Sequence, residues 1–216
     1  MPDGRSGMSV EMLSLGRLHV ARLCHDLGGI AGTLGGTLDL LGSDDPGMQD
    51  LLRETALALR LRLRLYAAAW GAAAVDLDAA QFEELLQGAP AVPRVTFDLA
   101  ALVQGQRIPA GLVPLALNAA LLGTEALPRG GVVRLGGSAG QGLSILPQGR
   151  GAAWPPSLLR ALAGNDPAAL LEEGGPRRML APLVVMLAAE AGWHAALALG
   201  APGSEGAAPL LLSPGP

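Results

Sequence analysis

An apolar stripe at helical spacing is the feature that most constrains the fold of this 216-residue chain. On a helix with about 3.6 residues per turn, seven apolar side chains separated by three or four positions share one face. The pattern predicts a helix over about residues 9–41, and its apolar face must be buried against another element. The stripe consists of Val20, Leu23, Leu27, Ile30, Leu34, Leu38 and Leu41.

A histidine faces away from this stripe. His25 falls on the opposite side of the predicted helix, with Asp26 directly after it. Gly28, Gly29 and Gly32 follow, and each glycine costs a helix about 1 kcal/mol relative to alanine. A helix tolerates that cost where another molecule must come close to its backbone. We therefore expect an outward imidazole that a second protein approaches, the alternative being an idle surface histidine.

A second amphipathic helix follows a turn at residues 42–46. It is predicted to reach about residue 73, with apolar positions that alternate spacings of four and three, as in coiled coils. Two antiparallel helices with one apolar face each cannot bury that surface alone. Pairing two hairpins into a four-helix bundle solves the problem, so a homodimer is expected. The second stripe consists of Leu52, Ala56, Leu59, Leu63, Tyr66 and Trp70.

Composition changes near residues 75–78 and predicts two parts. Residues 1–76 would be the helical dimerisation hairpin that carries His25, and residues 77–216 an α+β domain with helices on one face of a sheet. Helices are expected near 80–86, 109–123, 156–163, 167–172 and 177–191. Strands are expected near 94–99, 132–135, 143–146, 194–199 and 209–212, with a glycine-rich loop over 136–142 and frayed ends at 1–7 and 213–216.

Charge and cysteine content limit the function. The net charge of −4 and the pI near 5.3 argue against nucleic acid as the main partner. Cys24 is the single cysteine, so no disulfide forms within the chain and a cytoplasmic location is expected. The most apolar window, residues 179–189, is too short to span a bilayer. The three histidines lie too far apart in sequence for a metal site.

The segment Ala21-Arg22-Leu23-Cys24-His25-Asp26-Leu27 resembles the phospho-acceptor box of sensor histidine kinases. It is closer still to that of the ChpT-type histidine phosphotransferases. This resemblance implies a dimeric helical hairpin followed by a degenerate kinase-like ATP-binding domain. Both groups usually carry a proline five residues after the histidine. Ile30 stands there in this chain, a departure that affects docking detail more than phosphorylation.

The second half resembles the kinase ATP-binding domain without its chemistry. Asn118 falls on the first asparagine of the N box, but Leu122 replaces the asparagine that holds Mg²⁺ in kinases. An apolar side chain cannot ligate a cation that requires oxygen ligands. Pro147 stands where the adenine-reading aspartate belongs. The sequence therefore predicts a kinase-like fold that binds no ATP.

Taken together, the resemblance implies a phosphorelay intermediate without a cofactor or metal of its own. His25 would accept a phosphoryl group from the receiver domain of a hybrid sensor kinase and pass it to the receiver of a response regulator. The partner receiver would supply Mg²⁺. Asp26 would assist the imidazole, Arg22 would contact the phosphate or the receiver, and Gly28, Gly29 and Gly32 would give docking clearance. The alternatives are a non-catalytic dimeric scaffold and an atypical ATP-dependent histidine kinase.

Overall fold

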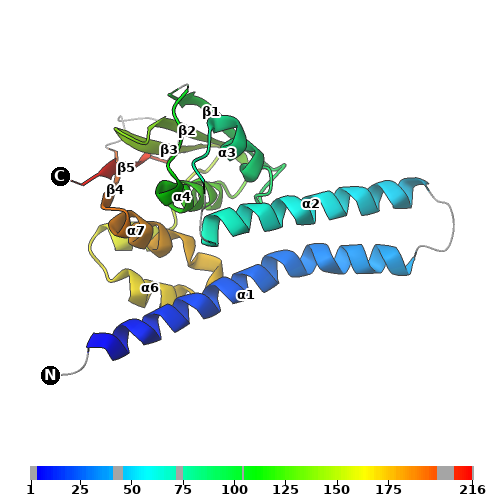
Figure 1. Ribbon diagram of the computed structural model, residues 1–216, viewed down its shortest axis with the longest axis horizontal. Coiled ribbons are helices and arrows are strands. Elements are labelled where there is room, and N and C mark those ends of the chain that lie inside the picture. Colours follow the sequence, from blue (N-terminus) through cyan, green and yellow to red (C-terminus); the bar gives the residue numbers. More distant parts are fainter. Residues whose placement is uncertain (1–3, 41–45, 72–74, 104, 199–206, 216) are drawn as a thin grey trace.

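Two long helices form an antiparallel hairpin that projects from the rest of the molecule (Figure 1). The computed structural model describes residues 4–40, 46–71, 75–103, 105–198 and 207–215. Helix α1 (Gly4–Asp39) begins earlier than expected and continues unbroken through its glycines. Helix α2 (Pro46–Trp70) runs back along it. Most of the predicted turn at 42–46, and Leu41, lie outside the described residues.

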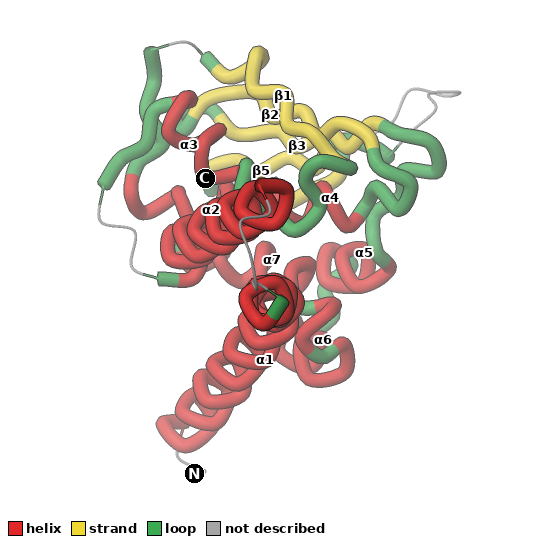
Figure 2. Tube along the Cα trace, turned by 90° about the vertical axis from the view of Figure 1, so that its right-hand side faces the viewer, coloured by secondary structure: helices red, strands yellow, loops and turns green. Residues whose placement is uncertain are grey.

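The remainder is a five-stranded sheet with helices on one face (Figures 1 and 2). The strand order is β1-β2-β3-β5-β4; β1 and β2 are parallel and the other neighbours are antiparallel. The predicted α+β fold is confirmed. The strands are β1 (Val95–Leu102), β2 (Gly131–Ser138), β3 (Gly142–Gln148), β4 (Trp193–Leu197) and β5 (Leu210–Pro214).

Helices α4 and α7 pack against each other beneath the sheet, and α4 also contacts the end of α2. The short helix α3 is set by a capping box, in which Asp78 and Gln81 each accept a hydrogen bond from the other's backbone. The remaining helices are α3 (Ala79–Leu86), α4 (Val113–Glu125), α5 (Pro156–Leu162), α6 (Pro167–Gly174) and α7 (Leu180–Glu190), with 3-10 turns η1 (Ala110–Leu112) and η2 (Pro176–Arg178).

Several predicted boundaries differ from the structure. The hairpin expected over 136–142 is present but its loop is shorter than predicted, because β2 and β3 stay paired through Gly137 and up to Ser138 and Gly142. Gly137 has a φ of 93°, and a Cβ there would collide with the Gly142 carbonyl oxygen, so glycine permits the close strand approach. At the C-terminus, β5 continues through Ser213 and Pro214. At the N-terminus, residues 4–7 belong to α1 rather than to a frayed end.

The base of the hairpin shares one hydrophobic core with the sheet domain. Leu65, Tyr66 and Ala69 of α2 are buried in the same cluster as α4 and the strands. The Tyr66 and Trp70 rings stack with their centroids 4.3 Å apart. The position of the helical hairpin relative to the sheet is therefore set by packing, not by a linker alone.

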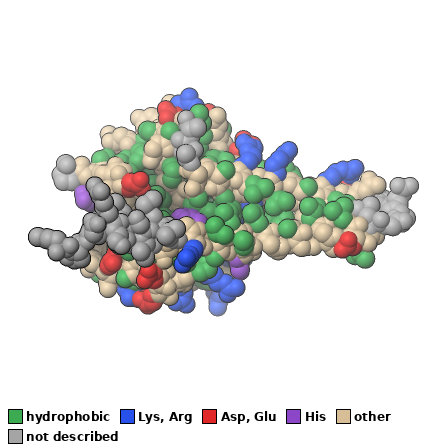
Figure 3. Space-filling model, turned by 60° about the horizontal axis from the view of Figure 1, so that its bottom comes forward, with side chains coloured by type: hydrophobic (Ala, Val, Ile, Leu, Met, Phe, Trp, Pro, Cys, Tyr) green, Lys and Arg blue, Asp and Glu red, His purple; other side chains and the backbone are tan. Residues whose placement is uncertain are grey.

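The far part of the hairpin leaves apolar side chains in solvent. The predicted stripe on α1 is partly buried in its middle, but Val20 and Leu38 are 58% and 54% exposed. On α2, Leu63 is 47% exposed, whereas Tyr66 is buried. Figure 3 shows hydrophobic side chains gathered along the projecting hairpin. One chain alone does not bury both stripes.

Candidate phosphotransfer site

His25 projects from α1 with 54% of its side chain exposed. Its Nδ1 lies 2.9 Å from Asp26 Oδ1, and its Nε2 lies 3.2 Å from Arg177 Nη2. An arginine only donates hydrogen bonds, so we assign Nε2 as the acceptor and Nδ1 as the protonated nitrogen. The expected hydrogen bond between the imidazole and Asp26 is present. These two contacts favour one tautomer, with the lone pair on Nε2.

Asp26 is far less exposed than its neighbour, at 7%. Its Oδ2 accepts hydrogen bonds from Arg22 Nε at 2.8 Å and from the Tyr66 hydroxyl at 2.5 Å. Burial alone raises the pKa of Asp26, but the hydrogen bonds from Tyr66, His25 and Arg22 outweigh it and lower that pKa below its ordinary value. Asp26 is therefore a carboxylate at neutral pH and holds the Nδ1 proton.

Tyr66 supports Asp26 from the second helix. Burial first, and then the hydrogen bond to Asp26, raise the pKa of the Tyr66 phenol well above its ordinary value. The hydroxyl therefore remains a donor. The sequence placed Tyr66 only in an apolar stripe. The signal that could have found its role is that it is the single tyrosine of the chain and that a buried tyrosine hydroxyl needs a partner.

Arg22 faces inward rather than toward a docking partner. Its side chain is 15% exposed and pairs with Asp26 and, at 3.4 Å, with Glu125 of α4. Its Nη1 also donates to the carbonyl oxygens of Pro176 and Arg177, at 3.2 and 3.4 Å. Burial raises the pKa of Glu125 to about 7, against the opposing effect of the Arg22 charge. In this structure Arg22 connects α1 to η2, and its predicted contact with a receiver stays a prediction.

The predicted docking glycines line the solvent side of α1. Gly28, Gly29 and Gly32 are exposed, and a Cβ on any of them would meet no heavy atom within 4 Å. An open groove of about 440 Å³ between α1 and α2 passes Gly29 and Ile30. The surface next to His25 is thus low in bulk, and the docking role of the glycines stays a prediction.

Comparisons with known proteins identify the family of this chain. The family model described as histidine phosphotransferase C-terminal domain matches residues 79–201. The chain is 31% identical to the protein phosphotransferase ChpT of Brucella abortus (strain 2308), over 85% of this chain and 88% of that protein. The chain belongs to the ChpT-type histidine phosphotransferase family. A solved bacterial phosphotransferase structure matches with a TM-score of 0.68 and 29% identity, covering 93% of this chain and 95% of that one.

In this histidine phosphotransferase, Asn118, whose sequence context resembles the N box of kinases, helps hold the fold together. Asn118 is fully buried; its Oδ1 accepts from Trp70 Nε1 at 2.9 Å, and its Nδ2 donates to the carbonyls of Ala69 and Pro114. Leu122 is also fully buried. Pro147 lies inside β3, in register with Val133 of β2. All three residues are therefore part of the packed interior or of the sheet.

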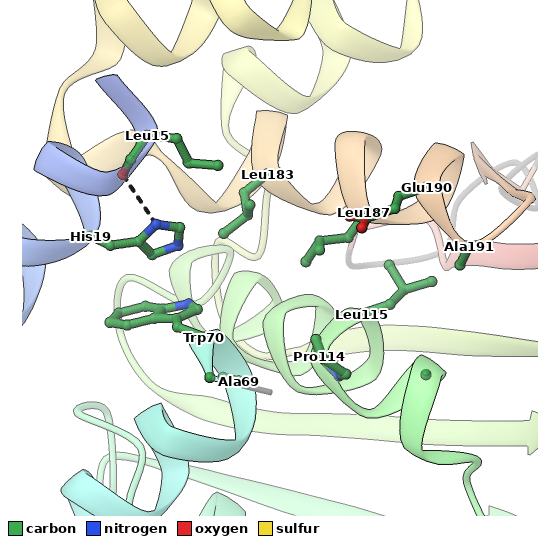
Figure 4. Close-up of a pocket in the computed structure, with 12 residues that line it drawn as sticks. Leu15, His19, Ala69, Trp70, Pro114, Leu115, Leu183, Leu187, Glu190 and Ala191 are labelled. Atoms are coloured by element: carbon green, nitrogen blue, oxygen red, sulfur yellow. Dashed lines mark hydrogen bonds between the residues drawn. The ribbon is translucent and has the colours of Figure 1, made fainter. Parts of the chain in front are cut away.

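A cavity of about 480 Å³ lies beside the Trp70 indole, between α4 and α7. In Figure 4, His19 and Trp70 lie at one end and Glu190 and Ala191 at the other. Burial lowers the pKa of His19 below its ordinary value, against the hydrogen bond to the Leu15 carbonyl. Among the residues that line the cavity, Glu190 is the charged one. The lining therefore contains no arginine that could bind a polyphosphate.

The residues that the structure describes contain no group of three histidine, cysteine, aspartate or glutamate side chains that could hold a metal ion. No helix among them has both the length and the apolar character of a membrane span.

Proposed function

We propose that this histidine phosphotransferase is a phosphorelay intermediate that carries a phosphoryl group between receiver-domain aspartates on His25. The observation that carries the proposal is the pair of contacts on the 54% exposed imidazole: Asp26 lies at Nδ1 and Arg177 at Nε2, which assigns the proton to Nδ1 and the lone pair to Nε2. A neutral imidazole nitrogen is a competent nucleophile. The family membership supports the phosphotransferase activity itself.

The transfer needs no redox change and no further reactant. Nε2 of His25 attacks the phosphorus of a receiver's aspartyl phosphate; the N–P bond forms as the P–O bond to the aspartate breaks, and that oxygen leaves as a carboxylate. The Nδ1 proton stays in its hydrogen bond with Asp26, which stabilises the cationic ring. The reverse step on a second receiver restores the free imidazole. Each receiver would contribute Mg²⁺ from its own acidic pocket.

The same proposal excludes ATP as the phosphoryl donor. Asn118 is already occupied by Trp70 and two backbone carbonyls. Leu122 and Pro147 offer neither a magnesium ligand nor an acceptor for adenine. The lining of the cavity beside Trp70 has no arginine for a triphosphate. These features support a chain that phosphorylates only through a partner.

A homodimer would bury the exposed stripe of the hairpin. The exposed large apolar residues on α1 and α2 include Leu38 and Leu63 at 54% and 47%, and pairing two hairpins in a four-helix bundle covers such positions. Light scattering should give twice the chain mass for the wild type. Leu38→Asp should shift the protein to the monomer, whereas Leu159→Asp, at a 50% exposed position on α5, should not. A monomeric wild type would contradict this part of the proposal.

The decisive experiment is a transfer assay with a purified receiver domain of a hybrid sensor kinase that is radiolabelled on its aspartate. Wild type should take up the label and pass it to a response-regulator receiver. His25→Ala should do neither, while His194→Ala, an exposed histidine on β4, should behave as wild type.

Three results would contradict the proposal. A wild type that never acquires label is not a phosphotransferase for receivers. If His25→Ala passes label as well as wild type, the hairpin acts only as a scaffold. Label acquired from ATP alone, with no receiver present, would identify an autokinase.

A further inference from the structure

We propose that Arg177 binds the phosphoryl group while it is on His25 and during its transfer, which makes this arginine a catalytic residue from the C-terminal part of the chain. The inference rests on the proposed function, since it assigns a partner to the nitrogen that is phosphorylated. Arg177 is the side chain that contacts His25 Nε2, through Nη2 at 3.2 Å. Its side chain is exposed, so a phosphoryl group that arrives from outside can reach it.

The turn that carries Arg177 is anchored at both ends. Gly175 ends α6 with a φ of 63°, a left-handed conformation that favours glycine, and its N–H donates to the Leu171 carbonyl. One turn later, the Arg178 N–H donates to the Gly175 carbonyl at 3.2 Å. Arg177 therefore projects from a short, defined 3-10 turn, η2, at the surface of α1.

Arg22 fixes this turn to the helix that carries His25. Its Nη1 donates to the Pro176 and Arg177 carbonyls, while its Nε donates to Asp26. The same guanidinium thus sets the position of the carboxylate on one side of the imidazole and of the turn on the other. Arg22 acts as a positioning residue: it does not contact His25 Nε2, but it holds the groups that flank both ring nitrogens.

The chemistry of transfer suits a guanidinium at this place. In phosphoryl transfer, negative charge is spread over three equatorial oxygens, and arginine is well matched to bind two of them through parallel N–H groups. When the phosphorus bonds to Nε2, its oxygens occupy the space beside that nitrogen. The Arg177 N–H groups turn from the nitrogen lone pair to those oxygens. Arg177 forms no covalent bond and gives up no proton.

The test uses the full chain and phosphoramidate, a small donor whose P–N bond breaks to release ammonia as the phosphoryl group moves to imidazole. Arg177→Ala should slow the phosphorylation of His25 by about 10- to 100-fold, the effect of losing one charge-assisted contact. Arg177→Lys keeps the charge without the fork and should recover part of the rate. The matched control is Arg178→Ala, an exposed neighbour in the same turn, which should react like wild type.

A second measurement separates binding from simple folding effects. After the donor is removed, the lifetime of phosphorylated His25 is followed by intact mass, together with the thermal melting curve. Arg177→Ala should change the lifetime and leave the melting curve unchanged, because its side chain is exposed.

The outcomes distinguish this inference from the function on which it rests. Wild type that acquires no phosphoryl group on His25 overturns both. Wild type that is phosphorylated, with Arg177→Ala matching it in rate and lifetime, overturns the role of Arg177 alone. A faster reaction of Arg177→Ala also overturns it, since Arg177 would then only shield Nε2.

Discussion

The hairpin contacts the sheet domain at two polar networks. In each network several hydrogen bonds converge on one side chain, but the two networks differ in their exposure to solvent. Around Asp26, donors from Arg22, Tyr66 and His25 converge on one carboxylate, yet His25 remains 54% exposed. Around Asn118, donors and acceptors from Trp70, Ala69 and Pro114 converge on one amide that is fully buried. The first network leaves the His25 imidazole at the surface, and the second is enclosed.

The difference separates a network that positions an exposed imidazole from one that is enclosed in the core. Both networks help join α2 to the rest of the chain, so both should contribute to stability. In the proposed function, only the Asp26 network orients the nucleophile. Substitutions in the Asp26 network should therefore lower mainly the phosphorylation rate. Substitutions in the Asn118 network should lower mainly the free energy of unfolding.

The largest effect on activity is expected for Asp26→Asn. The neutral amide no longer stabilises the cationic ring that forms on phosphorylation, so the rate per folded molecule should fall by about 30- to 100-fold. The NH₂ group of the new asparagine must also point either at the Arg22 and Tyr66 donors or at the protonated Nδ1 of His25. In both orientations a donor faces a donor. The rate is measured with phosphoramidate and divided by the folded fraction from circular dichroism. An unchanged normalised rate would remove Asp26 from the mechanism.

The opposite result, a loss of stability without a loss of rate, is expected for Asn118→Ala. The substitution leaves the buried Trp70 N–H without its acceptor and removes two donors from backbone carbonyls, which should lower the free energy of unfolding by about 2–4 kcal/mol. The phosphorylation rate of the folded fraction should remain at the wild-type value. Urea denaturation measures the first quantity, and Asn165→Ala, at an exposed position, is the control. A loss of rate in the folded fraction would mean that the two networks are not separate.

Sequence alone predicted the parts of this comparison that are local. Apolar spacing predicted both helices of the hairpin, and adjacency predicted the pairing of His25 with Asp26. Leu122 and Pro147, at the motif positions of a magnesium ligand and an adenine-reading aspartate, predicted a domain that binds no ATP, and this stays a prediction. Side-chain hydrogen bonds within one helix or between neighbouring residues follow from helix geometry, and these predictions needed nothing more.

The residues that the sequence did not predict come from distant segments. Arg177 is 152 positions from His25, and Glu125 is 103 positions from Arg22. The spacing of apolar residues does not indicate which loop of the second half of the chain contacts α1. The glycines at 136–137 illustrate the opposite error: they were interpreted as loop residues, although their small size permits close strand pairing. Tertiary packing decides both cases.

A smaller effect is expected for Tyr66→Phe, which removes one hydrogen bond from Asp26 and keeps the buried ring. Stability should fall by about 1–2 kcal/mol, and the phosphorylation rate by about 3- to 10-fold, because Arg22 still holds the carboxylate. The stacking with Trp70 is retained, so the Asn118 network should not change. Equal rates for Tyr66→Phe and Asp26→Asn would show that the tyrosine, not the carboxylate charge, controls the imidazole.

Glu125 lies between the two networks, and its ionisation tests how independent they are. It lines a cavity of about 180 Å³ with Arg22, Tyr66 and Trp70, and burial raises its pKa to about 7. An ordinary glutamate has a pKa of about 4.3. Between these two values the folded chain keeps a proton that the unfolded chain has lost. The contribution of Glu125 to stability therefore falls as the pH rises from about 4.5 to 7.

Glu125→Gln removes this titration, so its stability relative to wild type should rise with pH. The two proteins should unfold at similar urea concentrations at pH 5, and at pH 8 the variant should be the more stable by about 1–3 kcal/mol. Groups common to both proteins cancel in that difference. Glu190→Gln, at an exposed position on α7, should follow wild type at both pH values. If Glu125→Gln instead loses stability at pH 8, the ion pair with Arg22 outweighs burial, and the two networks are coupled through that charge.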